Sequence, residues 1–194
     1  MGSLCYFCMM IRIRKAQPSD AGAIAPIMLT AMEEIIYYFI GESDRQKAIA
    51  FLVHHIAQPG NQYSYEHIIV AEEDEEIVGQ ICLYSGDSLE QLRAPVLSYL
   101  RMHYNREPNL GQETQGGEIY IDTIAVSPIA QGRGIGKTLL LYVIDLFVHR
   151  YSEVLGLLVD KNNPKAKELY VNMGFKPIKD VHLFGKELQH MQYS

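Results

Sequence analysis

The sequence is short of cysteine, of long apolar runs and of positive charge, and each shortage excludes a class of protein. Three cysteines are too few for a disulfide framework, and the Cys5-x-x-Cys8 pair lacks the second pair or histidine cluster that completes a zinc site. No apolar run approaches the ~20 residues that a membrane span needs. A net charge of −6 disfavours a nucleic-acid backbone as the main partner. We therefore expect a cytoplasmic protein with no metal, no membrane and no nucleic-acid partner, present as a monomer or homodimer.

The 194 residues, of which 48% are hydrophobic, are enough to bury one full core. Residues 1–9 are apolar, lack the basic start and cleavage site of a signal peptide, and place Tyr6 where a myristoylation signal needs Ser or Thr. We expect them to be an extension, native or introduced by cloning. A single domain is expected over residues 10–194, with an insertion at 85–117.

Hydrophobic periodicity predicts the elements of this domain. Strands are expected near residues 11–14, 67–71, 77–83, 118–126, 154–159 and within 181–188, and helices over 18–40, 43–58, 134–149 and 164–173. A helix interrupted near Pro95 is expected inside the insertion. The acidic run 72–76 connects two strands of a hairpin and is interpreted as a solvated turn. This order predicts a mixed sheet with helices on both faces.

A glycine-rich loop joins the strand that ends at Val126 to the next helix. Its backbone N–H groups have no partner within the helix, the helix dipole adds positive potential, and glycine lets the backbone approach an anion closely. The pattern predicts a phosphate cradle, with side-chain donors from Gln131 and Arg133. The loop is too short for a P-loop, and no acidic residue follows about 20 positions on as in a dinucleotide fold. A glycine-rich turn without a ligand is the alternative.

A second element is the helix that begins in Asn163-Pro164. Asparagine favours the N-cap and proline the first turn of a helix. Ala166 and Tyr170 are four residues apart and share one face, so the small side chain leaves room for a bound chain and the phenol projects beyond it. By itself, this helix is better explained by a core tyrosine and an incidental cap.

The two elements together resemble the GNAT superfamily of acyl-CoA N-acyltransferases. The shared pattern is Gln131-x-x-Gly134-x-Gly136 followed by Asn163-x-x-Ala166 and Tyr170, and it covers residues 118–175, while the order of elements agrees from about residue 10 to 188. The resemblance implies an α/β (α+β) fold with a mixed, mostly antiparallel sheet, helices on both faces, and strands that splay at the cofactor site. It implies acetyl-CoA as cofactor and an amine-bearing acceptor.

The resemblance also implies a role for each matching residue. The strand residues Ile124, Ala125 and Val126 would offer backbone groups to the pantetheine arm and the acyl carbonyl. Asn163 would contact the cofactor arm, and Tyr170 would lie near the thioester sulfur. The pyrophosphate would lie on the backbone of the loop, which consists of Gln131, Gly132, Arg133, Gly134, Ile135, Gly136 and Lys137.

The chemistry requires a base, because an alkylammonium with a pKa near ~10.4 is not nucleophilic. A strand with period two places Glu118, Tyr120, Asp122, Ile124 and Val126 on one face. Asp122 is the first candidate for the base and the more remote Glu118 the second. The alternative is that Asp122 only orients its neighbours.

The acceptor site is expected on the side of the sheet opposite to cofactor entry, where the first helix meets the insertion. Glu33 and Glu34 would attract a cation, and aromatic residues would line the pocket. The alternative is that the carboxylates are solvated and the tyrosines only pack. The candidate aromatic residues are Tyr37, Tyr38, Tyr99, Tyr104 and, on the strand, Tyr120.

Two other functions remain open at this point. A non-catalytic acyl-CoA-binding or sensing module would keep the cradle without turnover, although it would need neither Tyr170 nor Asp122. A nucleotide-binding protein would bind ATP better than coenzyme A.

Overall fold

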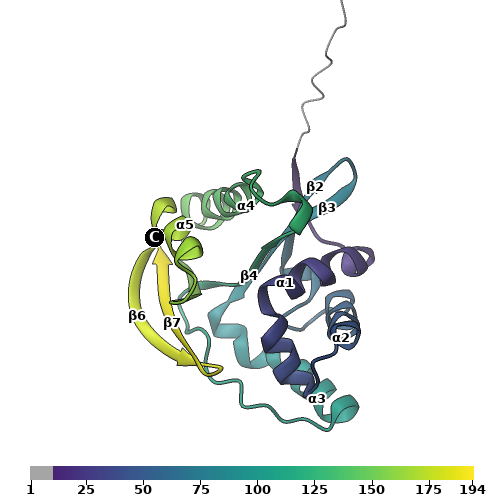
Figure 1. Cartoon of the computed structure of the whole chain (residues 1–194). Coiled ribbons are helices and arrows are strands. Elements are labelled where there is room, and N and C mark those ends of the chain that lie inside the picture. Colours follow the sequence, from purple (N-terminus) through teal and green to yellow (C-terminus); the bar gives the residue numbers. More distant parts are fainter. Residues whose placement is uncertain (1–10) are drawn as a thin grey trace, which may run out of the picture.

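A computed structural model describes residues 11–194, so the expectations for residues 1–9 lie outside the described part of the chain. Seven strands form one sheet in the order β1-β2-β3-β4-β5-β7-β6. All neighbouring strands are antiparallel except β4 and β5, which are parallel. The sheet separates two groups of helices (Figure 1), which confirms the predicted mixed sheet with helices on both faces.

One face is covered by α1 (Ala21–Ile40), α2 (Arg45–Ala57) and α3 (Leu89–Tyr104). The helix predicted over 18–40 ends at Gly41, which has a left-handed φ of 77°, and Asp44 caps α2 by accepting the N–H groups of Gln46 and Lys47. By length and composition Pro18–Ile40 could cross a membrane, against the expectation that no such run exists. Its buried side chains instead pack in the core against α2 and the sheet.

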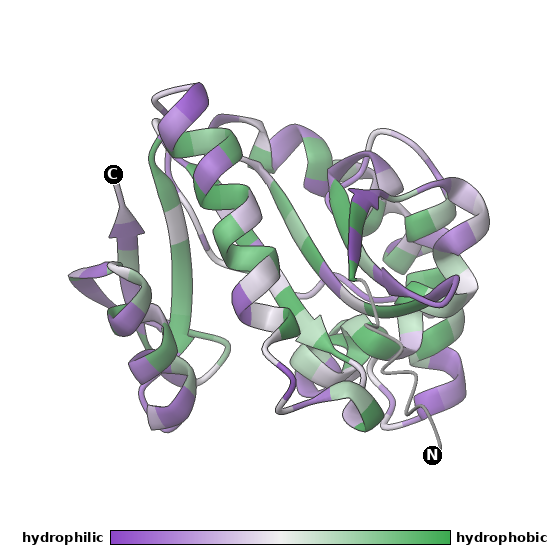
Figure 2. Cartoon of the chain, turned by 90° about the horizontal axis from the view of Figure 1, so that it is seen from above, coloured by the Kyte–Doolittle hydropathy of each residue, from purple (hydrophilic) through white to green (hydrophobic). Residues whose placement is uncertain are grey.

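The other face is covered by α4 (Ile135–Val143) and α5 (Pro164–Met173). The helix predicted over 134–149 continues beyond α4 as a π-helical segment, Ile144–Arg150. The helix predicted over 164–173 is confirmed at both ends, with Asn163 as N-cap and Gly174 in the left-handed C-cap conformation. Figure 2 shows the apolar residues gathered on the strands and on the inward sides of the helices.

The first hairpin consists of β2 (Ile68–Glu73) and β3 (Glu76–Ser85), and β1 (Arg12–Lys15) lies beside β2. The prediction that residues 72–76 form only a solvated turn is wrong in part. Asp74 and Glu75 make the turn, with positive φ, but Glu72 and Glu73 lie in β2. Glu72 accepts a hydrogen bond from Arg14 at 2.7 Å, because the strand carries its carboxylate to the neighbouring strand rather than into solvent.

A β-bulge interrupts β4 (Ile119–Val126). Thr123 and Ile121 pair with the adjacent β3 residues Cys82 and Leu83, so Asp122 is an extra residue with no partner of its own in that ladder. A bulge bends the strand and redirects the side chains that follow it. A single face along the whole strand requires unbroken alternation, which a bulge reverses.

The bulge corrects the predicted face of β4. Ile124 and Val126 pack with the α4 and α5 cluster, whereas Tyr120 belongs to a small cluster on the opposite face. Asp122 shares that opposite face, because its carboxylate meets side chains from β3 and from the loop before β2. The single face predicted from Glu118 to Val126 is therefore wrong beyond Asp122.

Strands β4 and β5 (Leu155–Asp160) pair over only part of their length. The parallel register joins residues 119–121 to residues 155–157. Past that point β4 continues for five residues to Val126 beside β3 alone. The two strands thus diverge, which confirms the expected splay and leaves one edge of the later β4 backbone facing a gap.

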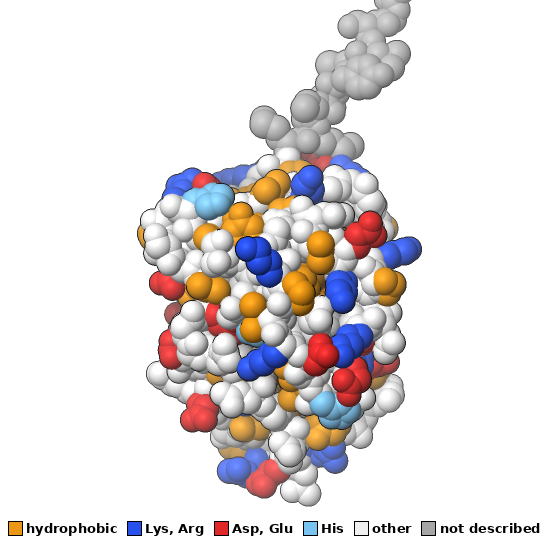
Figure 3. Space-filling view, turned by 90° about the vertical axis from the view of Figure 1, so that its left-hand side faces the viewer, with side chains coloured by type: hydrophobic (Ala, Val, Ile, Leu, Met, Phe, Trp, Pro, Cys, Tyr) orange, Lys and Arg blue, Asp and Glu red, His pale blue; other side chains and the backbone are white. Residues whose placement is uncertain are grey.

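The C-terminal region forms a hairpin of β6 (Lys176–Leu183) and β7 (Lys186–Tyr193). The prediction of one final strand within residues 181–188 is wrong, since that window covers the hairpin tip, where Phe184 and Gly185 have positive φ. Both strands consist mostly of polar residues, so they lack the alternation of apolar and polar residues that predicts a strand. Figure 3 shows cationic, anionic and apolar side chains interspersed on the face of the molecule that includes this hairpin.

The expected insertion contains a continuous helix. α3 runs through Pro95 without the predicted interruption, although the proline removes one helical hydrogen bond. Residues 105–118 then lead from α3 across one end of the molecule to the start of β4 (Figure 1). This segment lies beside both the α1 side and the β6–β7 hairpin, so it borders the cavities described below.

Candidate functional site

The predicted anion cradle lies at the start of α4. Gly132 and Gly134 have φ values of 77° and 80°, a region that favours glycine, and an added Cβ at either would meet no atom within 4 Å. The first backbone hydrogen bond of this helical turn is donated by the N–H of Thr138 to the carbonyl of Gly134, at 2.9 Å. The N–H groups of Ile135 and Gly136 precede it and have no partner inside the helix. The loop therefore has the backbone form that an anion site needs.

Side chains fix this loop against the sheet. Gln131 Nε2 donates to the Val126 carbonyl at 3.3 Å. The guanidinium of Arg133 forms an ion pair with Glu73 of β2, with one N–O distance of 2.8 Å. Gly136 lies close to the end of β4, since an added Cβ would be 3.7 Å from Val126 Cγ2. The structure thus brings the loop and the end of β4 together, while Arg133 is directed to Glu73 in this arrangement.

The gap beside β4 adjoins the cradle. In an antiparallel pair, successive peptide groups point alternately toward the partner and away from it. Around Ile124, Ala125 and Val126, half of the peptide groups bond to β3. The other half face the side from which β5 has diverged. These outward N–H and C=O groups can receive an extended ligand as a further strand would.

Asn163 and Tyr170 occupy the predicted positions on α5. Asn163 Oδ1 accepts the N–H of Ala166 at 3.1 Å, and Pro164 follows at the first turn. Tyr170 is buried in the cluster of the α4 and α5 face, with its ring edge-on to Phe175 at a centroid distance of 5.8 Å. Burial raises the pKa of Tyr170 to about 12, so the phenol stays protonated at neutral pH.

Asp122 lies on the opposite face of the sheet from Tyr170. Its carboxylate accepts a hydrogen bond from Tyr84 Oη at 2.7 Å and a longer one from Gln62 Nε2 at 3.4 Å. Burial raises the pKa of Asp122, although the bond from Tyr84 and the charge of Arg93 act in the opposite direction. A carboxylate with a raised pKa is a better proton acceptor than a solvated one.

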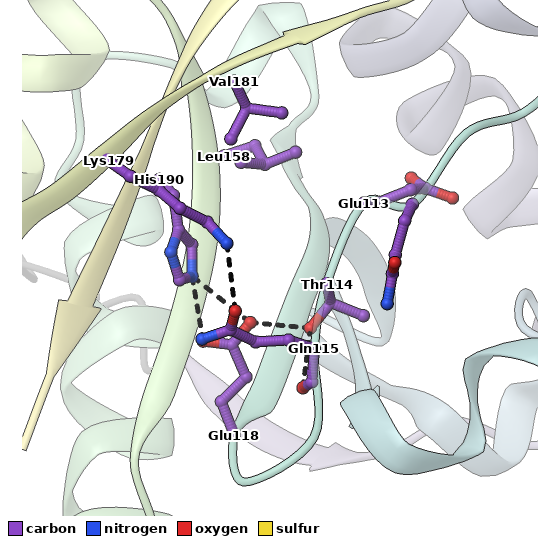
Figure 4. Close-up of a pocket in the computed structure, with 9 residues that line it drawn as sticks. Glu113, Thr114, Gln115, Glu118, Leu158, Lys179, Val181 and His190 are labelled. Carbon is purple, nitrogen blue, oxygen red and sulfur yellow. Dashed lines mark hydrogen bonds and ion pairs between the residues drawn. The ribbon is translucent and has the colours of Figure 1, made fainter.

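Glu118, the second candidate for the base, is committed to other contacts. It precedes β4, is 2% exposed, and its carboxylate accepts hydrogen bonds from Thr114 Oγ1 at 2.6 Å, Gln192 Nε2 at 2.7 Å and His190 Nε2 at 2.9 Å. Burial alone would raise the pKa of Glu118, but these hydrogen bonds together lower it. Glu118 therefore ties the start of β4 to β7, as Figure 4 shows, rather than presenting a basic oxygen.

The contact between Glu118 and β5 explains one glycine. A Cβ at Gly156 would lie 2.1 Å from Glu118 Oε2, closer than any side-chain carbon can approach. The cavity above this cluster, about 140 Å³, is lined by Thr114, Glu118 and His190 together with residues of β6.

A larger cavity, about 330 Å³, lies between α1 and the β6–β7 hairpin tip. Two predicted acceptor residues, Glu34 and Tyr38, line it together with Asn109, Phe184 and Lys186. Glu34 forms an ion pair with Lys186 at 2.6 Å, and Tyr38 Oη donates to the Asn109 carbonyl at 3.4 Å. Phe184 and Lys186 were not among the predicted acceptor residues, because the hairpin of β6 and β7 was not predicted from the sequence.

The other predicted acceptor residues lie elsewhere. Glu33 accepts hydrogen bonds from Tyr37 and from Arg45 of α2, both at 2.8 Å. Tyr120 is 3% exposed, with its ring edge-on to Tyr84. These residues stabilise the α1–α2 and β3–β4 contacts and do not line the larger cavity.

Tyr99 and Tyr104, which were also predicted to line a pocket, line neither of these two cavities. Tyr99 stacks on His54 at a centroid distance of 4.2 Å, and both tyrosines contact Phe51, so they pack α3 against α2. This is the packing alternative considered from the sequence.

Comparison with known proteins identifies related sequences and structures. The model of the acetyltransferase (GNAT) family matches residues 36–175. The chain is 30% identical over 167 residues to YhfO, an uncharacterized N-acetyltransferase of Bacillus subtilis, and the alignment covers 86% of this chain and 90% of that one. It is 39% identical over 62 residues to the mycothiol acetyltransferase of Beutenbergia cavernae, a match that covers 32% of this chain and only 20% of that relative. A solved structure described as an acetyltransferase superposes with a TM-score of 0.80 at 29% identity, covering 94% of this chain and 98% of that one.

Proposed function

Because the chain belongs to the acetyltransferase (GNAT) family, we propose that it transfers the acetyl group of acetyl-CoA to a primary amine, by direct attack within a ternary complex. The observation that carries the proposal is the gap between β4 and β5. The cradle and Tyr170 lie on one face of the sheet beside this gap, and Asp122 lies on the opposite face. A ligand that enters over α4 and an amine that enters past α1 can then meet at the end of β4. We place this reaction in the cytoplasm.

The residues of the cradle fit the phosphates of coenzyme A. Glycines at 132 and 134 hold the loop in a left-handed conformation and leave space around it, and the first N–H groups of α4 point outward. Asn163 and the outward groups of Ile124 and Val126 would hold the pantetheine arm along the gap. When bound, acetyl-CoA supplies the activated thioester.

Asp122 takes the proton that the protonated amine must lose. The carboxylate gains an O–H bond as the ammonium loses an N–H bond, and the free amine then forms the new C–N bond. As the C–S bond breaks, coenzyme A leaves as the thiolate and the nitrogen releases its second proton to solvent, which gives the neutral amide. A backbone N–H of β4 stabilises the negative charge that develops on the acyl oxygen. Tyr84 keeps the Asp122 carboxylate oriented through its 2.7 Å hydrogen bond.

Tyr170 stabilises the departing thiolate as a hydrogen-bond donor. Its pKa of about 12 exceeds the ~8.5 of an ordinary thiol. Full proton transfer from the phenol to the thiolate would thus be uphill by about 5 kcal/mol. The hydrogen bond to a charged sulfur needs no such transfer, and the thiolate takes its final proton from solvent.

We propose that the amine occupies the cavity lined by Glu34, Tyr38 and Phe184. This cavity lies on the α1 side of the sheet, the same side as Asp122. Tyr38→Ala should raise the acceptor KM about tenfold and leave the cofactor KM unchanged. Tyr37→Ala is the matched control, since the neighbouring tyrosine faces Glu33 and does not line the cavity. Equal effects of the two substitutions would place the acceptor elsewhere.

The proposed reaction is tested by free-thiol release with acetyl-CoA and a panel of primary amines, with the acetylated product confirmed by mass spectrometry. Turnover with at least one amine above the rate of spontaneous hydrolysis is expected. Cofactor binding without turnover across the panel would instead support an acyl-CoA-binding module.

A further inference from the structure

One lysine of the chain already holds an ammonium group in the larger cavity. Lys186 is the first residue of β7, at the hairpin tip that reaches toward α1 (Figure 1), and it lines the cavity together with Glu34. Its Nζ lies 2.6 Å from Glu34 Oε2. The hydrogen bond to Glu34 raises the pKa of Lys186, so this side chain is a cation at neutral pH. The cavity carboxylate that could receive an amine is thus paired with an amine of the chain itself.

A second carboxylate lies within reach of the same ammonium group. Asp160, the last residue of β5, places its Oδ2 3.7 Å from Lys186 Nζ. Its other oxygen, Oδ1, accepts the backbone N–H of Asn162 at 2.8 Å, which orients the carboxylate. Asp160 does not line the cavity. Its Oδ2 is therefore a second ionic partner for Lys186, outside the space that an acceptor would occupy.

The three charges leave room for one more cation. Glu34 and Asp160 are two carboxylates and Lys186 is one ammonium group, so the cluster keeps one uncompensated negative charge. Within residues 11–194, neither carboxylate forms an ion pair with any other Lys, Arg or His. The neighbouring Lys161 pairs with other carboxylates instead. A protonated amine that enters the cavity would therefore make the cluster neutral, and Lys186 would not have to be left without a partner.

The side chain of Lys186 can change partners without a change in the backbone. Its Nζ needs to move by about 1 Å to come from 3.7 Å to the ~2.8 Å of a charge-assisted hydrogen bond with Asp160. A lysine has a flexible four-carbon stem and three rotatable donors. The side chain of Glu34 is 77% exposed and that of Lys186 is 38% exposed, so the pair is not locked by packing. Exposed ion pairs contribute little to stability, so exchanging one for the other costs little.

We propose that Glu34 binds the cationic group of the acceptor, and that Lys186 holds this site in the absence of acceptor and moves to Asp160 when the acceptor binds. The inference rests on the acceptor cavity proposed above. The ligand is a protonated primary amine with an apolar body, because the cavity wall beside Glu34 includes Tyr38 and Phe184. Asp160 is a positioning residue, since it acts on the acceptor only through Lys186.

The exchange is tested by binding of benzylamine, a cation at neutral pH, without any cofactor. Its Kd is measured by NMR titration at about 0.15 M salt, where exposed charges more than ~8 Å apart are largely screened. Lys186→Met should bind benzylamine about threefold more tightly, because the competing ammonium group is gone. Asp160→Asn should bind it about threefold more weakly, because Lys186 loses its alternative partner. Glu34→Gln should also weaken binding, because the site itself is lost.

The double substitution separates exchange from simple attraction. If Asp160 acts only through Lys186, Asp160→Asn should lose most of its effect when Lys186→Met is also present. Benzyl alcohol has the same ring without the charge, so its binding should be the same in every variant. An effect of Asp160→Asn that persists in the double variant overturns the exchange. Weaker binding of benzylamine to Lys186→Met, or no binding to the wild type, overturns it as well.

Lys161→Met is the matched control. Lys161 also contacts two carboxylates, those of Asp180 at 2.8 Å and Glu187 at 3.9 Å, and its side chain is 37% exposed, but it does not line the cavity. The substitution removes the same charge as Lys186→Met and should leave benzylamine binding unchanged. Equal effects of the two substitutions would reduce the result to net charge and overturn the site.

The proposed reaction gives a second readout. With an acceptor identified by thiol release, KM should fall about threefold in Lys186→Met and rise about threefold in Asp160→Asn, and the change should lie in KM rather than in kcat. A change in kcat with an unaltered KM overturns the exchange while the proposed reaction stands. If no amine is turned over, the proposed function fails, but the benzylamine titration still decides the exchange at Glu34, because it needs no cofactor.

Discussion

Replacing Tyr170 by phenylalanine isolates the contribution of one hydroxyl group. The ring contact with Phe175 survives the change, because phenylalanine keeps the ring that packs at 5.8 Å. The structure therefore predicts a folded protein with nearly unchanged cofactor affinity. Only the hydrogen bond to the leaving thiolate is lost.

The size of the effect follows from the raised pKa of Tyr170. General-acid catalysis by full proton transfer contributes about 10²–10⁴ in rate. A phenol with a pKa of about 12 is too weak an acid for that transfer, and a hydrogen bond to a charged group contributes ~1.5–3 kcal/mol. The expected loss in kcat is thus about 10- to 100-fold.

The measurement is single-turnover thiol release at saturating cofactor and amine, so that chemistry limits the rate. The wild-type rate should show no loss near pH 10 from ionisation of Tyr170, because its pKa lies higher. If Tyr170→Phe keeps the wild-type rate, the hydroxyl group has no role in the reaction and Tyr170 only packs in the core. A loss far above 100-fold would instead show that the phenol transfers its proton.

Two further substitutions test the strand residues. Asp122→Asn should flatten the acid limb of the kcat/KM profile, because the amide cannot accept the amine proton, and an unaltered profile would move the base elsewhere. Glu118→Gln should lower the free energy of unfolding by about 1–3 kcal/mol at pH 7, or roughly 2–12 °C in Tm, with little change in the shape of the pH–rate profile. The pKa of Glu118 is lowered in the folded protein, so its stabilisation is present above the unfolded pKa and is lost as pH falls through the folded pKa. Chemical denaturation at pH 7 and pH 3 should show a smaller difference between wild type and Glu118→Gln at the lower pH, and an equal difference at both would contradict this reasoning.

Local rules were sufficient for the elements of the proposed cofactor site. The cap of α5 depends on Asn163, Pro164 and Gly174, whose preferences are set by their own backbone and neighbours. The left-handed conformation of Gly134 has the same local origin. The sequence therefore predicted the glycine-rich turn before α4 and the bounds of α5 correctly.

The acceptor side depends on contacts between distant residues. The bulge at Asp122 is a property of the register with β3, and no periodicity within β4 reveals it. Gln62 reaches Asp122 from a position 60 residues before it, so no spacing rule connects the two residues. The hairpin tip at Phe184 lies between two mostly polar strands, where alternation carries little information.

The central claim is that the loop at the start of α4 holds the pyrophosphate of coenzyme A, and calorimetric titration tests it directly. Wild type should bind coenzyme A more tightly than pantetheine, which lacks the phosphates, and Gly134→Val should lose most of that difference while it still binds pantetheine. Gly60→Val is the matched control, because Gly60 has a similar φ of 72° and similarly open surroundings but lies after α2. Equal affinity of Gly134→Val and Gly60→Val for coenzyme A, or no binding of coenzyme A to the wild type at millimolar concentration, would contradict the account.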